Sequence, residues 1–312
     1  MEKEQLLFEN IGEYVSLDGE LMGAAEFARR DAAAVGGAAW GGGGSVWDAE
    51  IVYEVLRVID GIPVFFEDHC ERLACSLASV GADAVFDPAW LCRSIGRLFA
   101  ANGIASGNVK IWVACGRGGM SWLLNANRSF YPPPEYYRDG VRAELMDYTR
   151  ASPNVKRAVA GYKQKVKSLL DSTGAFELLL RDEGGNLTEG SRTNLFFVAG
   201  GRLFTAPDRM ILKGIVKKHI VAAAVKAGIA IDETPIRADM LGGVDGAFIT
   251  GTSIGALPLS HIGGMALKSA QNPIIMRIGK EYARIERDYV SAAQAKAKAK
   301  AKAAGESESE GK

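Results

Sequence analysis

The clearest strand pattern lies in the first third of the chain. Aliphatic and polar residues alternate over 51–59 (IVYEVLRVI), and a second apolar run covers 62–66. Asp60-Gly61 separates the two runs and is typical of a tight turn. The pattern therefore predicts that a β-hairpin opens the first folded unit, and the apolar run 109–114 (VKIWVA) predicts a buried strand after it.

Helical spacing appears next. Leu73, Leu77 and Val80 recur at 3.6-residue spacing and predict a helix that Asp68 caps and that ends near Gly81. Further helices are expected at 88–101, 162–172 and 214–227, and further strands at 141–148, 176–180, 195–198, 203–205 and 247–250. Because strands and helices do not alternate regularly, we predict an α+β fold rather than a doubly wound sheet.

Three consecutive prolines in 131–134 (YPPP) mark the domain boundary, because they can continue neither a helix nor a central strand. We expect a small N-terminal α/β domain at 1–131, with a Gly-rich loop at 34–45, and a larger mixed β/α domain at 132–290. Residues 291–312 combine an Ala/Lys run, which could be transiently helical, with an acidic tail. Their low complexity predicts that they lie outside the fold.

Charge excludes some partners. Lys+Arg and Asp+Glu both number 37, so no overall field would attract nucleic acid or a membrane surface. The first 15 residues carry acids and no long apolar stretch, which indicates a cytoplasmic, soluble protein. The four cysteines form no CxxC pair and the three histidines are scattered, so neither a disulfide framework nor a metal site is expected.

Two segments could hold an anion. Leu212–Ile215 leads into a helix whose first N–H groups would be free, and Thr250–Ser253 ends a strand with hydroxyl groups and a glycine. Taken singly, each segment is more often a plain helix start or a strand-end turn. Only their combination with other segments makes the site specific.

Five segments together resemble the class IV aminotransferases, the fold-type IV enzymes that use pyridoxal 5'-phosphate (PLP). The resemblance covers about residues 45–265, and its segments are 52–61, Glu67–Leu73 ("H-x-x-R-L"), Leu187–Phe196 ("T-E-G-S-x-x-N-x-F"), Leu212–Ile215 and Phe248–Ser253 ("F-x-x-G-T"). It implies a two-domain fold like that of D-amino acid aminotransferases. It also implies a homodimer with the active site between the two domains, near the partner subunit.

The resemblance assigns the cofactor-binding residues. It implies that Arg72 binds the phosphate and that Glu189 lies by the pyridine nitrogen and keeps it protonated. Backbone N–H groups and hydroxyls would supply the remaining phosphate contacts. The cofactor-binding set is completed by Asn194, Gly214, Ile215, Gly251, Thr252 and Ser253.

Four lysines compete for the covalent link to PLP. The family's lysine precedes the "T-E-G" glutamate by just over thirty residues, and this register favours Lys156 as the Schiff-base residue. Lys163 and Lys165 remain alternatives. Tyr162 could reach the phenolic oxygen of the cofactor, although the family's tyrosine comes one residue sooner after the lysine.

The chain departs from the family pattern in its substrate region. Cys115 stands where many members have an arginine that recognises a substrate carboxylate, and Arg117 is a possible substitute. Tyr53 is a second candidate for substrate contacts. Val216 replaces a threonine of the family's "G-I-T-R" segment, which removes one hydroxyl from the phosphate site.

Three functions follow from the resemblance. The first is transamination between an amino acid, possibly branched-chain or apolar, and a 2-oxo acid, with Lys156 as anchor and acid/base. The second is a lyase reaction of the aminodeoxychorismate-lyase type on the same cofactor apparatus. The third is a non-catalytic relative that binds PLP or a partner.

Overall fold

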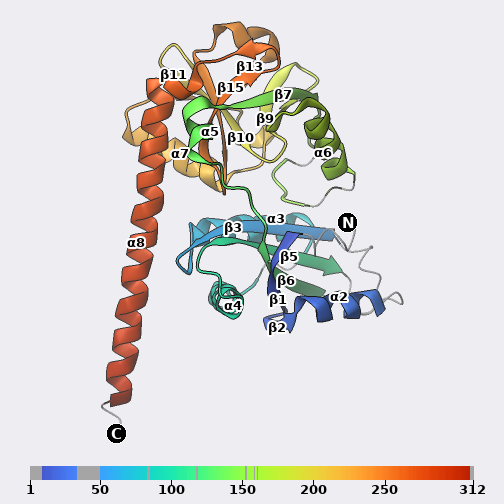
Figure 1. Ribbon diagram of the computed structural model, residues 1–312, viewed down its shortest axis with the longest axis vertical. Coiled ribbons are helices and arrows are strands. Elements are labelled where there is room, and N and C mark those ends of the chain that lie inside the picture. Colours follow the sequence, from blue (N-terminus) through green and yellow to red (C-terminus); the bar gives the residue numbers. More distant parts are fainter. Residues whose placement is uncertain are drawn as a thin grey trace.

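The computed structural model describes residues 9–33, 50–82, 85–116, 119–151, 153–157, 159 and 161–309. The Gly-rich segment 34–45 and Arg117 lie outside these residues. Two separate β-sheets organise the chain, one of six strands and one of ten. Figure 1 shows the six-stranded sheet and its helices below, the ten-stranded sheet above, and a long C-terminal helix beside both. The α+β expectation is confirmed.

The first sheet has the strand order β2-β1-β6-β5-β3-β4. Its strands are β1 (Asn10–Leu17), β2 (Glu20–Gly23), β3 (Glu50–Ile59), β4 (Ile62–Pro63), β5 (Gly107–Gly116) and β6 (Gly119–Asn127). Val52, Ile111 and Val113 face one core, which includes Leu73 from α3 (Phe66–Ser79) and residues of α4 (Pro88–Ala101). Trp112 and Ala114 face the other way, toward α2 (Ala24–Ala33).

The helix that Asp68 was predicted to cap begins before that residue, at Phe66, and its N-cap residue is Phe65. Phe65 precedes α3 with a left-handed φ of 52°, and its ring stacks on His219 at 3.6 Å. Asp68 does not cap the helix, because its carboxylate binds Lys218 at 2.6 Å and His219 at 2.7 Å. The apolar run 62–66, expected as a strand, is therefore divided between the short β4 and the start of α3.

The second sheet has the order β12-β11-β10-β14-β15-β7-β8-β9-β13, with β16 beside β15. Its strands are β7 (Val141–Asp147), β8 (Glu177–Arg181), β9 (Asn186–Gly190), β10 (Asn194–Ala199), β11 (Arg202–Phe204), β12 (Ile231–Asp232), β13 (Ile236–Arg237), β14 (Gly246–Gly251), β15 (Gly255–Ile262) and β16 (Met265–Ala266). The predicted strands of this half are confirmed to within two residues. The strands of this sheet that were not predicted are β9, β12, β13, β15 and β16, and those of the first sheet are β1, β2 and β6.

Helices cover the second sheet. They are α5 (Pro134–Asp139), α6 (Tyr162–Thr173), α7 (Ile215–Lys226) and α8 (Pro273–Ser309). Phe196 and Phe248 stack at 5.0 Å and pack against α7 and α8. Leu195 and Ile249, one residue away in each strand, face the opposite core. This alternation places α7 over the face that carries the candidate site.

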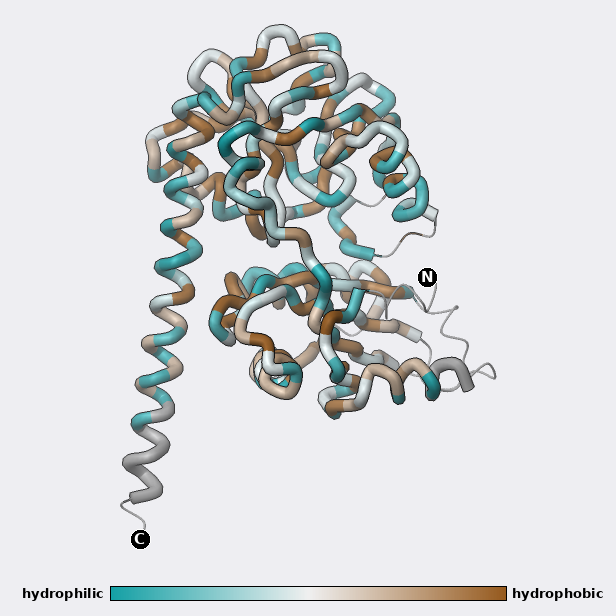
Figure 2. The backbone as a smooth tube through the Cα atoms, in the orientation of Figure 1, coloured by the Kyte–Doolittle hydropathy of each residue, from teal (hydrophilic) through white to brown (hydrophobic). Residues whose placement is uncertain are grey.

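The Ala/Lys segment, expected outside the fold, is part of α8. The helix runs without a break from Pro273 to Ser309, because alanine and lysine both favour helical backbone. Among the residues of α8 whose burial is described, Val290 is the last buried apolar one, and most of those in 291–300 are exposed. In Figure 2 the lower part of α8, before the grey residues, runs beside the half of the molecule that holds the six-stranded sheet. None of the described helices is long and apolar enough to cross a membrane.

Side chains join the two sheets and hold their relative position. Arg57 of β3 binds Glu286 of α8 at 3.1 Å. Tyr289 of α8 donates a hydrogen bond to Glu67 and accepts one from the backbone N–H of Phe66. These contacts attach the N-terminal end of α3 to α8, so the helix that carries Arg72 is fixed against the second sheet.

Candidate active site

Three polar side chains form a row across neighbouring strands of the second sheet. Asn194 of β10 lies opposite Glu189 of β9 and opposite Thr250 of β14. Residues directly opposite one another in antiparallel strands point to the same face. Glu189, Asn194 and Thr250 are buried, and Glu189 and Asn194 both bind the backbone of Leu212, just before α7. The structure thus brings together three segments that the sequence separates by up to 61 residues.

The start of α7 is open toward this row. Gly214 is the N-cap residue, and no side chain caps the helix. Asn194 Nδ2 donates to the carbonyl of Leu212 at 2.9 Å, and a Cβ at Gly214 would overlap the Asn194 amide oxygen. Only glycine at position 214 leaves room for the Asn194 side chain. The first N–H groups of α7, beginning with that of Ile215, are therefore available to an anion.

A buried hydroxyl lies next to this helix start without a partner. Thr250 is 1% exposed, and no described group lies within hydrogen-bond distance of its Oγ1. Gly251 ends β14 directly after it, and the turn continues through Thr252. Ser253 in the same turn accepts a hydrogen bond from Asn108 of β5 at 2.7 Å. An orphaned hydroxyl beside free helix N–H groups fits an oxyanion such as phosphate.

Lys156 lies along the free edge of β3. Its carbonyl accepts a hydrogen bond from Tyr53 N at 3.0 Å, and its Nζ lies 5.2 Å from the centroid of the Tyr53 ring. The side chain is partly buried, and desolvation lowers the pKa of its amine to about 8, with the Arg72 charge adding to the effect. The alternatives Lys163 and Lys165 are exposed on α6.

Arg72 of α3 points from the first sheet to the start of α7. Its Nη1 donates to the carbonyl of Lys213 at 3.0 Å, and its Nε and Nη2 bind Glu54 at 2.8 and 2.5 Å. Glu54 is 1% exposed, and the Arg72 charge holds the pKa of its carboxyl well below the usual range despite the opposing effect of burial. Arg72 is therefore a fixed cation beside Gly214.

Arg150 is a site residue that the sequence did not reveal. Its Nε donates to Glu189 Oε1 at 2.6 Å and its Nη2 to the carbonyl of Ser191 at 3.1 Å. Burial raises the pKa of Glu189 to about 7, whereas the Arg150 charge and a hydrogen bond from Leu212 N act in the opposite direction. No motif marks Arg150. Its position shortly before Lys156 was the one available signal.

Tyr162 begins α6 near this pair. Its hydroxyl donates to the carbonyl of Ser191 at 3.0 Å, its ring lies 4.8 Å from that of Tyr148, and the Arg150 guanidinium lies 5.3 Å from its centroid. Burial raises the pKa of its phenol. Tyr162 and Arg150 thus both donate hydrogen bonds to the carbonyl of Ser191.

Of the two substrate candidates, the structure describes Tyr53 but not Arg117. Tyr53 lies opposite Trp112 in the β3–β5 pairing, with Lys156 at its ring. Cys115 lies three positions after Trp112 and packs against the core on the opposite face of the sheet. The position where many family members carry arginine is therefore not on the Tyr53 face. Arg117 cannot be placed, since it lies outside the described residues.

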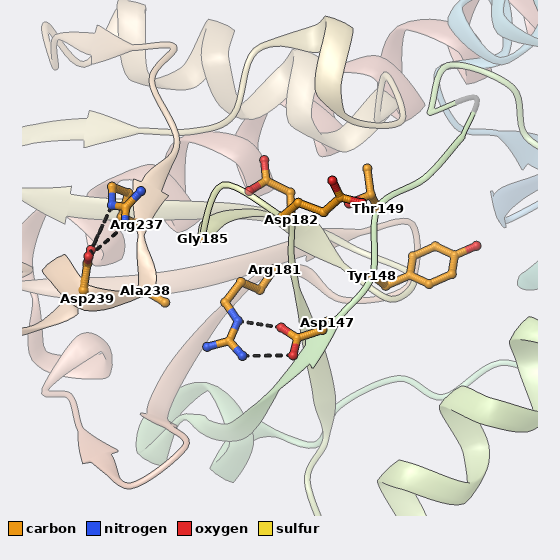
Figure 3. A pocket seen from close by; sticks show the side chains of 10 residues that line it. Asp147, Tyr148, Thr149, Arg181, Asp182, Gly185, Arg237, Ala238 and Asp239 are labelled. Atoms are coloured by element: carbon orange, nitrogen blue, oxygen red, sulfur yellow. Dashed lines mark hydrogen bonds and ion pairs between the residues drawn. The ribbon is translucent and has the colours of Figure 1, made fainter.

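A hollow in the second sheet lies apart from these residues. Figure 3 shows it at the ends of β7 and β8, where Arg181 binds Asp147 at 2.6 Å and Arg237 binds Asp239 at 2.8 Å. Both pairs are largely exposed, and the hollow contains none of the predicted site residues. In the described part of the chain, no group of three His, Cys, Asp or Glu side chains could hold a metal ion.

Comparison with known proteins identifies the family. The model for "Amino-transferase class IV" matches residues 51–262. The D-alanine aminotransferase of Bacillus licheniformis is 27% identical over 240 residues, which cover 73% of this chain and 84% of that protein.

Solved structures share the fold. The branched-chain amino acid aminotransferase of Escherichia coli superposes with a TM-score of 0.73 at 22% identity, covering 88% of this chain and 95% of that one. The branched-chain aminotransferase of the archaeon Thermoproteus uzoniensis, solved with norvaline, gives a TM-score of 0.69 at 23% identity, covering 88% and 94%. The family match spans more than half of the chain, and the protein is therefore a member of the class IV aminotransferases.

Proposed function

We propose that this protein transfers the amino group of an amino acid, apolar or branched-chain, to a 2-oxo acid, with PLP bound at Lys156. The observation that carries the proposal is the partly buried amine of Lys156, which lies among Tyr53, Arg72 and Glu54 with a pKa of about 8. A lysine amine that titrates near neutral pH can act both as a nucleophile and as a base.

The residues present fit PLP. A phosphate would be held by the first N–H groups of α7, by the orphaned hydroxyl of Thr250 and by Arg72. Lys156 would hold the aldehyde carbon. The buried carboxyl of Glu189 would face the pyridine nitrogen, because it lies in the same row of side chains as Asn194 and Thr250.

When bound, PLP withdraws electrons from the substrate α-carbon. The residues of this chain direct that chemistry. Lys156 carries a proton to or from the α-carbon with its amine. Glu189 provides a negative charge that keeps the ring nitrogen protonated, and the Arg150 guanidinium favours the ionised form of this carboxyl.

We propose modified roles for two residues that the resemblance assigned to cofactor binding, Arg72 and Tyr162. Arg72 would bind both Glu54 and a phosphate. Because its Nε and Nη2 already bind Glu54, it would contribute mainly its positive charge and not a two-pronged hydrogen bond to the phosphate. Tyr162 would act through the Ser191 carbonyl and the Arg150 guanidinium, since its hydroxyl is already bound there.

The attachment residue is tested by reduction with borohydride and peptide mapping. We expect a pyridoxyl group on Lys156. An adduct on Lys163 or Lys165 would move the active centre to α6, and no adduct with added PLP would contradict the cofactor assignment. Product analysis separates the two reactions: a 2-oxo acid together with the aminated cofactor supports transamination, whereas pyruvate with the lysine-bound cofactor retained supports the lyase reaction.

The substrate is tested with both enantiomers of alanine, leucine and valine as donors. Relatives and structural neighbours are named as aminotransferases of D-alanine and of branched-chain amino acids, and the aromatic ring of Tyr53 beside Lys156 suits an apolar side chain. We also propose a homodimer, which light scattering of the purified protein would test.

A further inference from the structure

Glu177 carries a buried carboxylate that the proposed chemistry does not use. It begins β8 and is fully buried. Its Oε1 accepts hydrogen bonds from the N–H groups of Leu178 at 2.8 Å and Ser191 at 3.2 Å, and from the Ser191 hydroxyl. Its Oε2 accepts one from the Thr193 hydroxyl at 3.0 Å, and the exposed Arg192 guanidinium lies 3.8 Å from the same atom. Hydrogen bonds to a carboxylate are stronger than those between neutral groups, so Glu177 holds the turn that connects β9 to β10.

This turn packs tightly on the carboxylate. Gly190 N donates to the carbonyl of Thr193 at 2.8 Å, and Ser191 N also donates to the carbonyl of Leu178 at 2.8 Å. A Cβ at Gly190 would overlap Thr193 Oγ1 and lie 3.1 Å from the carboxyl carbon of Glu177. The backbone of the turn is therefore fixed from both sides, by β8 and by the Glu177 side chain.

The carbonyl of Ser191 is the point where the turn meets the candidate active site. It accepts hydrogen bonds from Arg150 Nη2 at 3.1 Å and from the Tyr162 hydroxyl at 3.0 Å. The Arg150 guanidinium thus binds two groups, the Glu189 carboxylate and the Ser191 carbonyl. Two contacts fix the orientation of a guanidinium, whereas one contact would leave it free to turn.

We propose that Glu177 is a positioning residue, which fixes the Ser191 carbonyl so that this carbonyl holds the Arg150 guanidinium against Glu189. The inference rests on the proposed function, in which Glu189 faces the pyridine nitrogen. Loss of the anchor would release the Arg150 charge and raise the pKa of Glu189. Loss of the Glu177 negative charge alone would lower that pKa, because a nearby like charge disfavours ionisation. The two effects therefore differ in sign.

The test is a pH titration of Glu189 in the PLP-free protein. Carbon-13 NMR of the glutamate carboxyl groups follows it, and Glu189→Gln identifies the signal. Glu177→Leu removes every acceptor for the turn, whereas Ser191→Ala removes one donor and preserves the buried carboxylate. We expect the midpoint to rise from about 7 by about 1 pH unit in Glu177→Leu, and by less in Ser191→Ala. A fall, or an unchanged midpoint in both variants, would overturn the inference.

Glu177→Gln separates hydrogen bonding from charge. It loses the same charge as Glu177→Leu but retains an acceptor oxygen for Ser191, so the midpoint of Glu189 should not rise. A rise equal to that of Glu177→Leu would contradict the positioning role.

Arg150→Met shows whether the effect passes through Arg150. The Lys156 amine and the Tyr162 phenol also act on Glu189, and this background retains both. The rise caused by Ser191→Ala should disappear in it, because no guanidinium is left to position. Persistence of the rise would overturn the inference.

Thr205→Val controls for general destabilisation. It removes a buried hydrogen bond to the Leu195 carbonyl outside the turn and should leave the midpoint of Glu189 unchanged. A rise in this variant as large as that in Ser191→Ala would show loosening of the sheet instead of positioning. Failure of PLP to attach to Lys156 would contradict the proposed function, and the titration of the PLP-free protein would still report on Glu177.

Discussion

The Nε atom of Arg150 lies 2.6 Å from Oε1 of Glu189, a contact that ties the segment before Lys156 to the buried end of β9. Burial raises the pKa of the Glu189 carboxyl to about 7, and the Arg150 charge limits this rise. The Arg150 charge, together with the hydrogen bond from Leu212 N, therefore favours the ionised form of the carboxylate on which the proposed chemistry depends.

Arg150→Met should move the pH dependence of kcat/KM. The folded pKa of Glu189 is raised, so its ionised form is populated only as pH increases through about 7. Removal of Arg150 should raise this pKa further, which shifts the acidic limb of the profile upward and lowers activity at pH 7 about 10-fold or more. Arg150→Lys should restore part of the shift. An unchanged acidic limb would show that Glu189 does not control it.

Lys156→Met should abolish transamination and stabilise the PLP-free protein. Desolvation lowers the pKa of Lys156 from 10.5 to about 8, so the charged amine destabilises the fold at every pH below about 8. The effect diminishes as pH rises from 8 toward 10.5. We expect a gain of about 1–3 kcal/mol at pH 7 and little gain at pH 10 in urea unfolding. Destabilisation at pH 7 would contradict this prediction.

Gly214→Ala should weaken PLP binding. The new Cβ would overlap the Asn194 amide oxygen and displace the start of α7, which costs about 1–3 kcal/mol. Fluorescence titration with PLP measures the change, and we expect the Kd to rise at least about 10-fold. Gly279→Ala is the control, because nothing lies within 4 Å of its Cβ in α8. It should leave the Kd unchanged and stabilise the helix by about 1 kcal/mol.

Thr250→Val should have opposite effects on the PLP-free and the PLP-bound protein. The hydroxyl has no partner among the described residues, so its removal should raise the free energy of unfolding of the PLP-free protein by about 1 kcal/mol. The PLP Kd should rise about 5-fold through loss of one hydrogen bond. Thr205→Val, which removes a satisfied bond to Leu195, should only destabilise. An unchanged PLP Kd in Thr250→Val would remove this hydroxyl from the cofactor site.

Local structure was predictable where local interactions determine it. Helix α4 begins and ends as expected, because Asp87 caps it, Pro88 suits its first turn and its apolar stripe faces one core. The start of α3 was not predictable. Phe65 takes a left-handed conformation so that its ring packs on His219, and the Asp68 side chain is drawn to α7 instead of the helix end. The residues responsible, Lys218 and His219, lie about 150 positions further along the chain.

The sequence by itself determined the family, the order of the elements and the residue types of the cofactor site, because its motifs contain the residue types that the site needs, such as the glycine at the start of α7 that leaves room for the Asn194 side chain. Only the tertiary structure decided which groups meet. It paired Glu189 with Arg150, turned Cys115 away from Tyr53 and placed Lys156 at the Tyr53 ring. Such contacts depend on strand register and on the faces of the sheet, where a shift of one residue moves a side chain to the opposite side.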